Sequence, residues 1–316
     1  MKLVTITGCL GFIGSYVTRE CLSLGWKVYG IDKCTYAANE QLLEEFNEEE
    51  NFYFLSADIS TIESLPVCDV IINLAAESHV GNSIINSDEF IDTNVAGTHN
   101  LLEIVRRQPN NVNERPLFLH FSTDEVYGDI ISGAHSENHL LHPSNPYSAA
   151  KASADMLVLA WGRTYDIKYN ILRPTNNYGM YQYHEKLIPI SVRNLQRNKK
   201  IRLHDEGDPF RTWLHAADTA QAVITVIKNG EPNQVYNISG GFEQKNKDTV
   251  RKIIGAYFET EDNWENHVDL GYKRPGQDVR YSVNDDKIRA LGWKPLRVFD
   301  TEIYKIVQHY KNNFRW

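Results

Sequence analysis

Two short segments carry residues whose types and spacing can do chemistry. In Tyr-Ser-Ala-Ala-Lys, Tyr147 and Lys151 are four positions apart, which places them one turn apart on the same face of a helix. A lysine ammonium beside a phenol favours the phenolate, which can take a proton from an alcohol as hydride leaves. In Thr-Asp-Glu-Val-Tyr, Asp124 and Glu125 place a carboxylic acid beside a carboxylate, which suits elimination of water. Together the two pairs predict oxidation of an alcohol combined with a dehydration.

Composition limits the classes of protein to which this chain can belong. The chain has 316 residues, of which 42% are hydrophobic, and a net charge of −8, so no basic footprint for nucleic acid or for an anionic membrane is present. No apolar run approaches the roughly 20 residues of a membrane-spanning helix. The four cysteines lie in the first quarter without metal-ligand spacing. We therefore expect a cytoplasmic enzyme with no metal site, no nucleic-acid partner and no membrane partner.

Apolar runs typical of strands alternate with helical patterns over the first half of the chain. Strands are expected at 3–6, 27–31, 52–55, 70–74, 117–121 and 169–172, and helices at 13–24, 89–107 and 147–165. This alternation predicts an α/β protein with a doubly wound parallel sheet, the Rossmann fold.

After Pro174 the alternation breaks. There we expect a helix at 212–227, a strand at 235–238 and a helix at 249–258. The predicted organisation is a nucleotide-binding domain of residues 1–175 and 212–238. A smaller mixed α/β C-terminal lobe of residues 176–211 and 239–316 would bind the substrate.

A glycine-rich loop lies between the first expected strand and the first expected helix. Gly8 permits a tight turn, Gly11 lets the backbone approach a pyrophosphate, and Gly14 lets helix and strand pack closely. The helix that follows presents unpaired N–H groups to phosphates. Glycine loops also serve as simple turns, but the position of this one after a buried strand favours a dinucleotide site.

An acidic residue at the end of the second expected strand favours NAD over NADP. Asp32 lies about 20 residues after the glycine loop, where a carboxylate binds ribose hydroxyls and would repel a 2′-phosphate. Lys33 follows directly and weakens this preference, and Asp58 ends the third strand near the expected adenine site. The other residues predicted to line the NAD site are Phe12, Ile13, Thr35, Ile59, Leu74, Ala75, Ala76, Ser78, Thr93, Tyr147, Lys151 and Asn177.

Motifs along nearly the whole chain resemble those of the nucleoside-diphosphate-glucose 4,6-dehydratases of the extended short-chain dehydrogenase/reductase family. The Thr-Asp-Glu triplet is what separates these dehydratases from epimerases and decarboxylases of the same fold. The motifs are Gly-Cys-Leu-Gly-Phe-Ile-Gly (8–14), Leu-Ala-Ala-Glu-Ser-His-Val (74–80), Asn-Val-Ala-Gly-Thr (94–98), Ser-Thr-Asp-Glu-Val-Tyr-Gly (122–128), Pro-Tyr-Ser-Ala-Ala-Lys-Ala (146–152), Asn-Asn-Tyr-Gly (176–179), Glu-Lys-Leu-Ile-Pro (185–189) and Arg-Pro-Gly-Gln-Asp-Val-Arg-Tyr (274–281).

The resemblance implies a role for each catalytic candidate. Thr123 would hydrogen-bond O4 of the sugar, Tyr147 would deprotonate it, and Lys151 would hold Tyr147 ionised and bind the nicotinamide ribose. Glu125 would then remove the C5 proton, and Asp124 would protonate the departing O6 hydroxyl. The cofactor NAD would take hydride from C4, return it to C6 and stay bound throughout. The product would be a 4-keto-6-deoxy sugar nucleotide, a step toward deoxysugars such as rhamnose.

The resemblance also implies a nucleotide-sugar site and a homodimer. The residues expected to bind the substrate are Ser78, Thr123, Asn176, Lys186, Leu187, Arg211, Asn246 and Arg274. The two arginines suit a pyrophosphate, although either one alone is also typical of a surface ion pair. Uracil and thymine differ by one methyl group, so dTDP-glucose and UDP-glucose both remain open as substrates. Relatives pair the helices expected at 89–107 and 147–165 across a two-fold axis.

Other readings of the same residues remain. Asp124 and Glu125 could be a solvated loop, and Tyr147 a packed aromatic side chain on its helix. A sugar-nucleotide 4-epimerase or a UDP-glucuronate decarboxylase would keep Tyr147, Lys151 and NAD without needing the carboxylate pair. A non-catalytic dinucleotide-sensing protein would keep the glycine loop, with no reason to retain the four catalytic residues together.

Overall fold

The computed structural model describes residues 1–108, 115–273 and 278–313. Within these residues, seven strands form a parallel sheet in the order β10-β6-β5-β4-β1-β2-β3. The strands are β1 Leu3–Thr7, β2 Lys27–Asp32, β3 Phe52–Ser56, β4 Val70–Asn73, β5 Leu117–Phe121, β6 Tyr169–Pro174 and β10 Gln234–Ile238. The strand order reverses beside β1, so the predicted doubly wound sheet is confirmed.

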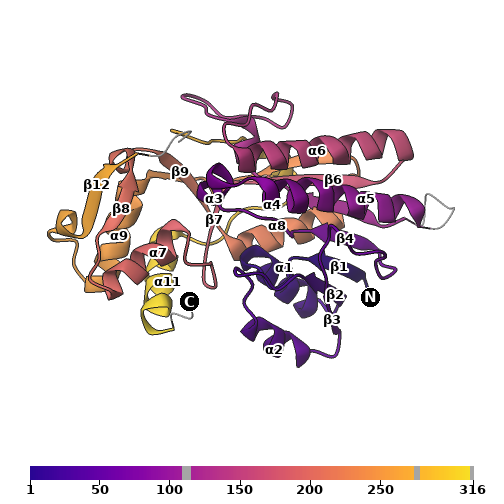
Figure 1. Cartoon of the computed structure of the whole chain (residues 1–316), viewed down its shortest axis with the longest axis horizontal. Coiled ribbons are helices and arrows are strands. Elements are labelled where there is room, and N and C mark those ends of the chain that lie inside the picture. The colour runs from indigo at the N-terminus through magenta and orange to yellow at the C-terminus, as the bar shows by residue number, and fades with distance from the viewer. Residues whose placement is uncertain (109–114, 274–277, 314–316) are drawn as a thin grey trace.

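Helices cover both faces of this sheet (Figure 1). On one face lie α1 Phe12–Ser23, α2 Gln41–Asn47 and α8 Ala216–Asn229, which share an apolar core with the strands. On the other face lie α3 Val80–Ile85, α4 Asp88–Phe90, a π-helix Ile91–Gly97, α5 Thr98–Arg107 and α6 Pro146–Tyr165. The inner strands are covered on both sides and are mainly apolar, and every residue of Val70–Asn73 is buried. The edge strand β3 is largely exposed.

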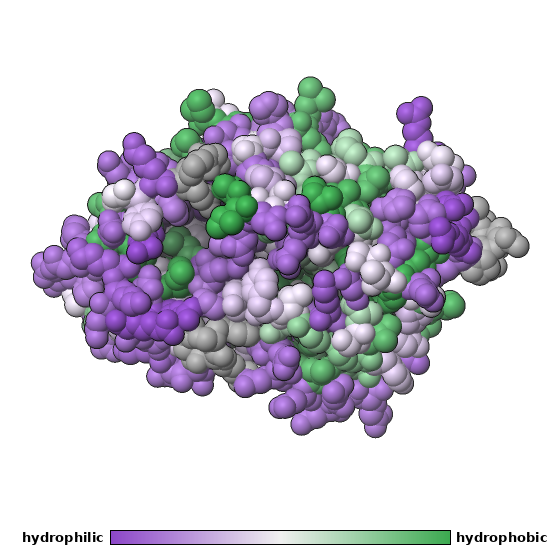
Figure 2. Space-filling model, viewed as in Figure 1, coloured by the Kyte–Doolittle hydropathy of each residue, from purple (hydrophilic) through white to green (hydrophobic). Residues whose placement is uncertain are grey.

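Two smaller sheets and the helices packed on them form the lobe at the other end of the molecule (Figure 1). The first sheet has the order β11-β9-β7 and the second pairs β12 with β8. These strands are β7 Asn176–Tyr178, β8 Ile201–His204, β9 Phe210–His215, β11 Phe242–Lys245 and β12 Val268–Tyr272. The helices are α7 Leu187–Gln196, α9 Asn246–Phe258 and α11 Phe299–Asn312. Helix α10 Asp286–Arg289 packs instead against β10, with Ile288 in the core of the large sheet. The surface in this view is mostly hydrophilic (Figure 2).

Two expected helices differ from the observed structure. The helix expected at 212–227 was wrong at its start, because residues up to His215 form β9 and the helix begins at Ala216. The side chain of His215 accepts a hydrogen bond from the N–H of Ala217 at 3.1 Å, which caps the helix at that point.

The helix expected at 89–107 is interrupted by the π-helix Ile91–Gly97. This segment turns Asn94 inward, where its side chain bonds both the N–H and the C=O of Glu77 at 2.9 Å. A π-helical turn within an α-helix is a frequent feature of functional sites. Among the described residues, no helix is both long enough and apolar enough to cross a membrane.

Candidate active site

The glycine loop has the geometry that a pyrophosphate site needs. Gly8 has φ +71°, and a Cβ there would lie 2.8 Å from the backbone N of Ala75. A Cβ on Gly14 would lie 1.9 Å from the carbonyl oxygen of Gly8, so only glycine allows helix α1 to pack this close to β1. Gly11 precedes the helix and offers no side-chain cap, which leaves the N–H groups of the first turn open to an anion.

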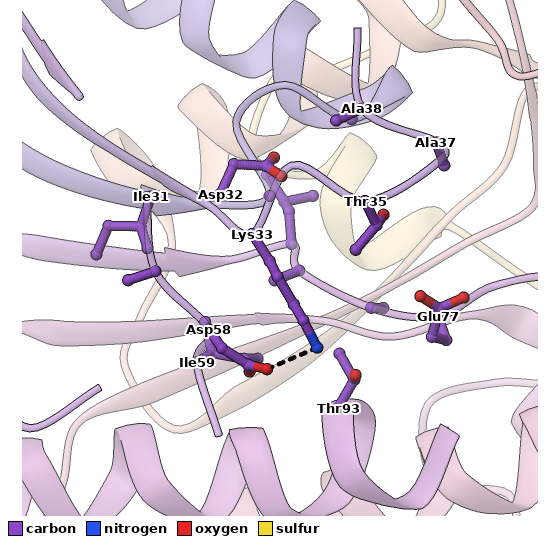
Figure 3. Close-up of a pocket in the computed structure, with 16 residues that line it drawn as sticks. Ile31, Asp32, Lys33, Thr35, Ala37, Ala38, Asp58, Ile59, Glu77 and Thr93 are labelled. Atoms are coloured by element: carbon purple, nitrogen blue, oxygen red, sulfur yellow. Dashed lines mark ion pairs between the residues drawn. The ribbon is translucent and has the colours of Figure 1, made fainter. Parts of the chain in front are cut away.

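Asp32 closes β2 beside this loop with its carboxylate fixed in place. It accepts hydrogen bonds from the N–H groups of Leu10 and Cys34, each at 2.9 Å. Burial raises its pKa above the usual value for a carboxyl group. Lys33 points away from Asp32 and forms a 2.7 Å ion pair with Asp58 (Figure 3). The lysine charge is therefore balanced by Asp58.

All of the predicted NAD-site residues line one of two adjoining pockets, which share Gly8, Gly11, Ala37, Leu74 and Ala76. The first pocket (Figure 3) also contains Asp32, Lys33, Thr35, Asp58, Ile59, Ala75 and Thr93. The second contains Phe12, Ile13, Gly14, Ser78, Tyr147, Lys151 and Asn177. The glycine loop and the carboxylate fit a dinucleotide that extends from one pocket into the other.

Tyr147 and Lys151 enter the second pocket from the first turns of helix α6. Asn145 caps this helix, with its side chain accepting from the N–H of Ser148 at 3.0 Å, and Pro146 follows as the first helical residue. The ammonium of Lys151 donates to the carbonyl oxygen of Phe121, the last residue of β5, at 2.5 Å. The cap thus fixes where the helix begins, and the helix sets both side chains beside the end of β5.

Burial controls the protonation of this pair. It raises the pKa of Tyr147 far above that of a free phenol, and the neighbouring charge of Glu125 adds to the effect. Burial also lowers the pKa of Lys151 to about 8, against an opposing effect from Asp155. In the ligand-free protein at neutral pH, Tyr147 is consequently a neutral phenol and Lys151 is still mostly an ammonium.

The Thr123-Asp124-Glu125 triplet lies directly after β5, in the short 3-10 helix Asp124–Tyr127. The hydroxyl of Thr123 caps this turn by accepting from the N–H of Glu125 at 3.3 Å, and it donates to Asp124 at 3.3 Å. All three residues line the second pocket together with Tyr147 and Lys151. The structure therefore brings the oxidising pair and the acid/base pair to one place.

The substrate candidates divide into two groups. Ser78, Thr123, Asn176 and Lys186 line the second pocket, and the Lys186 ammonium donates to the carbonyl oxygen of Ser78 at 2.7 Å. Leu187 begins α7 and packs in the apolar core of the lobe. It does not line the pocket.

Arg211 and Asn246 also lie outside the pocket lining, and Arg274 falls outside the described residues. The guanidinium of Arg211 is buried, donates to the carbonyl oxygens of Phe210 and Asp278, and lies over the ring of Tyr281.

Buried polar atoms at the pocket lack a hydrogen-bond partner within the described part of the chain, and three of them belong to candidate site residues or their neighbours. They are Oδ2 of Asp124, Oγ1 of Thr175 and Oδ1 of Asn176. Buried polar groups normally have hydrogen-bond partners, so these atoms indicate a ligand rich in hydroxyl groups.

Sequence reasoning missed several residues that line the same two pockets. They are Ala37, Ala38, Glu77, Phe121, Ser122, Thr175, Gln182, Tyr183 and Glu185. Most of them lie in loops, where neither periodicity nor chemistry distinguishes a lining residue from its neighbours. Ser122 is the exception, because it directly precedes the catalytic triplet.

Known proteins resemble this chain over almost all of its length. The family model described as GDP-mannose 4,6 dehydratase matches residues 5–306. A dTDP-glucose 4,6-dehydratase from Shigella flexneri is 39% identical to it, over 100% of this chain and 94% of the relative.

Solved structures agree in fold as well as in sequence. The DesIV dTDP-glucose 4,6-dehydratase from Streptomyces venezuelae, with NAD and TYD bound, superimposes with a TM-score of 0.91 at 35% identity, covering 98% of this chain and 97% of that one. A dTDP-glucose 4,6-dehydratase from Bacillus anthracis str. Ames, in complex with NAD, gives a TM-score of 0.88 at 35% identity, with 99% and 97% covered.

Proposed function

The chain belongs to the GDP-mannose 4,6 dehydratase family, and we propose that it converts dTDP-glucose to the 4-keto-6-deoxy-glucose nucleotide and water. It is an NAD-dependent sugar-nucleotide 4,6-dehydratase. The observation that carries this function is the meeting of Tyr147, Lys151, Asp124 and Glu125 in one pocket with the glycine loop. The full-length similarity to dTDP-glucose enzymes favours thymine over uracil as the base.

The residues of the pocket divide the reaction between them. Tyr147 takes the proton of the C4 hydroxyl, with Thr123 hydrogen-bonded to the same oxygen and Lys151 stabilising the phenolate that this requires. NAD, when bound, would supply the hydride acceptor for C4 and the hydride donor for C6, with C5 taking up a proton as C6 is reduced. The resulting C4 ketone acidifies the proton on C5, which Glu125 removes. Asp124 then protonates the C6 hydroxyl as it leaves.

The environment of Asp124 suits the acid role. It is 2% exposed, and burial raises its pKa to about 8, with the charge of Glu125 as the next largest cause. Asp124 is therefore protonated at neutral pH and can donate to a leaving hydroxyl. A 4-epimerase has no use for a proton held at this position.

Turnover of dTDP-glucose and UDP-glucose in parallel tests the proposal. A dehydratase yields a product that has lost one water, seen by mass spectrometry, and that forms the chromophore of a 4-keto-6-deoxy sugar in alkali. We expect a higher kcat/KM for dTDP-glucose, by about 1 kcal/mol or roughly fivefold for one methyl contact. Epimerised sugar of unchanged mass would contradict the function, and a preference for UDP-glucose would contradict the base.

We further propose a homodimer formed by helices α5 and α6. The apolar positions expected to form a stripe on α6 divide in the structure. Ala154 and Val158 are fully buried in their own subunit, whereas Leu157 and Trp161 are only partly buried. Met156, on the same helix, is 47% exposed. These last three are the apolar side chains of α6 that a partner subunit would cover. The cytoplasmic location stays a prediction.

A further inference from the structure

A buried polar layer crosses the large sheet just before the catalytic loop. It consists of side chains on five adjacent strands, all with 2% exposure or less: Thr7 on β1, Asn73 on β4, His120 on β5, Arg173 on β6 and Asn237 on β10. The Thr7 hydroxyl donates to Asn73 at 2.8 Å, and the amide of Asn73 lies 3.3 Å from Nδ1 of His120. Burying polar groups this deep in a sheet costs free energy of folding unless they are paired, so we looked for the group that this layer supports.

Asp155 on helix α6 joins the middle of this layer. Burial raises the pKa of its carboxyl group, whereas the charges of Arg173 and Lys151 favour the carboxylate. Its side chain is fully buried and accepts from Nε of Arg173 at 2.9 Å. Its other oxygen lies 3.6 Å from Nε2 of His120. Arg173 is held in turn by the hydroxyl of Tyr127, at 2.7 Å, and its guanidinium lies over the Tyr127 ring. The carboxylate of Asp155 is thus fixed on one side by a buried arginine.

On its other side Asp155 faces the catalytic lysine. Lys151 lies four residues earlier on α6, so the two side chains project from the same face one turn apart. Lys151 is 3% exposed, and its ammonium donates to the neutral carbonyl oxygen of Phe121. A buried ammonium needs a nearby anion to stay charged, and Asp155 is the carboxylate on the same helix face that supplies it.

We propose that Asp155 is a positioning residue that acts through Lys151, keeping its ammonium charged so that Tyr147 can ionise during the reaction. This inference rests on the proposed function, because the proposed function gives Lys151 and Tyr147 their catalytic roles. The negative charge of Asp155 offsets both buried cations. Arg173 balances it when Lys151 is neutral.

The other ionisable groups around the pair leave this role to Asp155. The charges of Glu125, Asp124 and Asp155 each raise the pKa of Tyr147, so any help that a carboxylate gives to its ionisation must pass through Lys151. His120 is kept neutral, because burial and the charges of Lys151 and Arg173 all lower its pKa. Of the charged groups, Asp155 is the one that raises the pKa of Lys151, against the effect of burial.

Replacing Asp155 by asparagine tests the role with little change of shape. In Asp155→Asn the pKa of Lys151 should fall, so the alkaline limb of the pH profile of kcat should move about one to three units toward acid. Asp124 also titrates near pH 8, but Asp155 is not among the causes of its shift, so a moving limb reports Lys151. Asp166→Asn, the same change at the exposed end of α6, should leave the limb in place. A lower kcat with an unmoved limb would overturn the proposal.

A second variant guards against a folding defect. Asp155→Asn leaves two buried cations uncompensated, whereas Asp155→Asn combined with Arg173→Gln removes one charge of each sign. The double variant should fold and show the same acid shift, since Arg173 is not among the causes of the Lys151 shift. An unmoved limb in the double variant would equally overturn the proposal.

Titration of the Lys151 side chain in the free protein, by NMR with 15N-labelled lysine, separates this proposal from the proposed function. The titration needs no turnover. If the protein dehydrated neither nucleotide sugar, the proposed function would be refuted, and the titration would still test the role of Asp155. We expect the Lys151 pKa to be lower in Asp155→Asn than in the wild type. An equal pKa in both proteins would refute the role of Asp155.

Discussion

Asp124 and Glu125 are neighbours in the chain, yet the fold gives their carboxyl groups different surroundings. Asp124 is 2% exposed, whereas Glu125 is only partly buried at the edge of the same pocket. Burial and the charge of Glu125 raise the pKa of Asp124 to about 8. Asp124 therefore holds a proton at neutral pH, next to the more exposed carboxyl group of Glu125.

Replacing Glu125 by glutamine should stop the reaction after oxidation. The C4 alcohol is still oxidised, but the base for C5 is missing, so turnover should fall roughly 10²–10⁴-fold. Absorbance in the reduced-nicotinamide band should rise in a single turnover and persist, and solvent deuterium at C5 should fall in parallel. Elimination at the wild-type rate would show that Glu125 is not the base.

Tyr147→Phe should fail one step earlier than Glu125→Gln. Without the phenol no base takes the C4 proton, so neither the reduced-nicotinamide band nor product should appear on mixing with substrate. The two variants are matched controls for one another, because both retain the pocket and the nucleotide site. If Tyr147→Phe also accumulated the reduced band, another group would be the base for C4.

The raised pKa of Asp124 makes folding stability depend on pH in a defined direction. The folded state binds the proton more tightly than the unfolded state, so this contribution is complete below the ordinary aspartate pKa of 3.8 and is lost as pH rises toward 8. Asp124→Asn removes that loss. In the ligand-free protein, its melting temperature relative to wild type should therefore increase from pH 5 to pH 8.

A charge control separates this effect from the general change in net charge. Asp166→Asn removes the same formal charge at the exposed end of α6, so its difference in melting temperature from wild type should stay nearly constant over the range. Equal pH dependence in both variants would contradict the raised pKa of Asp124.

The NAD side of the molecule was predictable from sequence, because its signals are local. The predicted pair Tyr147 and Lys151 lies in the first turns of α6. The glycine loop, Asp32 and the predicted acid/base pair each lie at the end of a strand. In a parallel sheet those ends meet at one edge, so correct strands place the residues together. Tyr147 and Thr123, which lie more than twenty residues apart in the sequence, were predicted to share a site, and both line the second pocket.

The lobe was harder to predict, because its sheets join segments distant in sequence. Strand β9 pairs with β7 and β11, and its apolar run reads as the start of the helix that follows. The role of Asp155 could not be predicted from the sequence either. Its pairing with Arg173 depends on β6 lying beside α6, which no local pattern encodes.

The cofactor should remain with the protein through purification, because it is regenerated in each cycle. Denaturing the purified protein should release NAD(H) and little NADP. Asp32→Asn removes one charge-assisted contact to the ribose, worth about 1.5–3 kcal/mol, so the preference for NAD over NADP should fall about 10- to 100-fold. Glu40→Gln, an exposed change before α2, should not alter the preference. NADP as the dominant species in the wild type would refute the role of Asp32.

A single substitution on α6 should weaken the proposed dimer strongly, because a two-fold interface contains every substitution twice. Met156→Lys places a charge where an apolar side chain, 47% exposed in the subunit, would be covered by the partner. A loss of about 1.4 kcal/mol at each copy raises the Kd about a hundredfold. Sedimentation velocity at micromolar concentration should then show monomer for Met156→Lys and dimer for the wild type. Val298→Lys, at a 64% exposed position before α11, should remain dimeric. Dissociation of both variants, or of neither, would place the interface elsewhere.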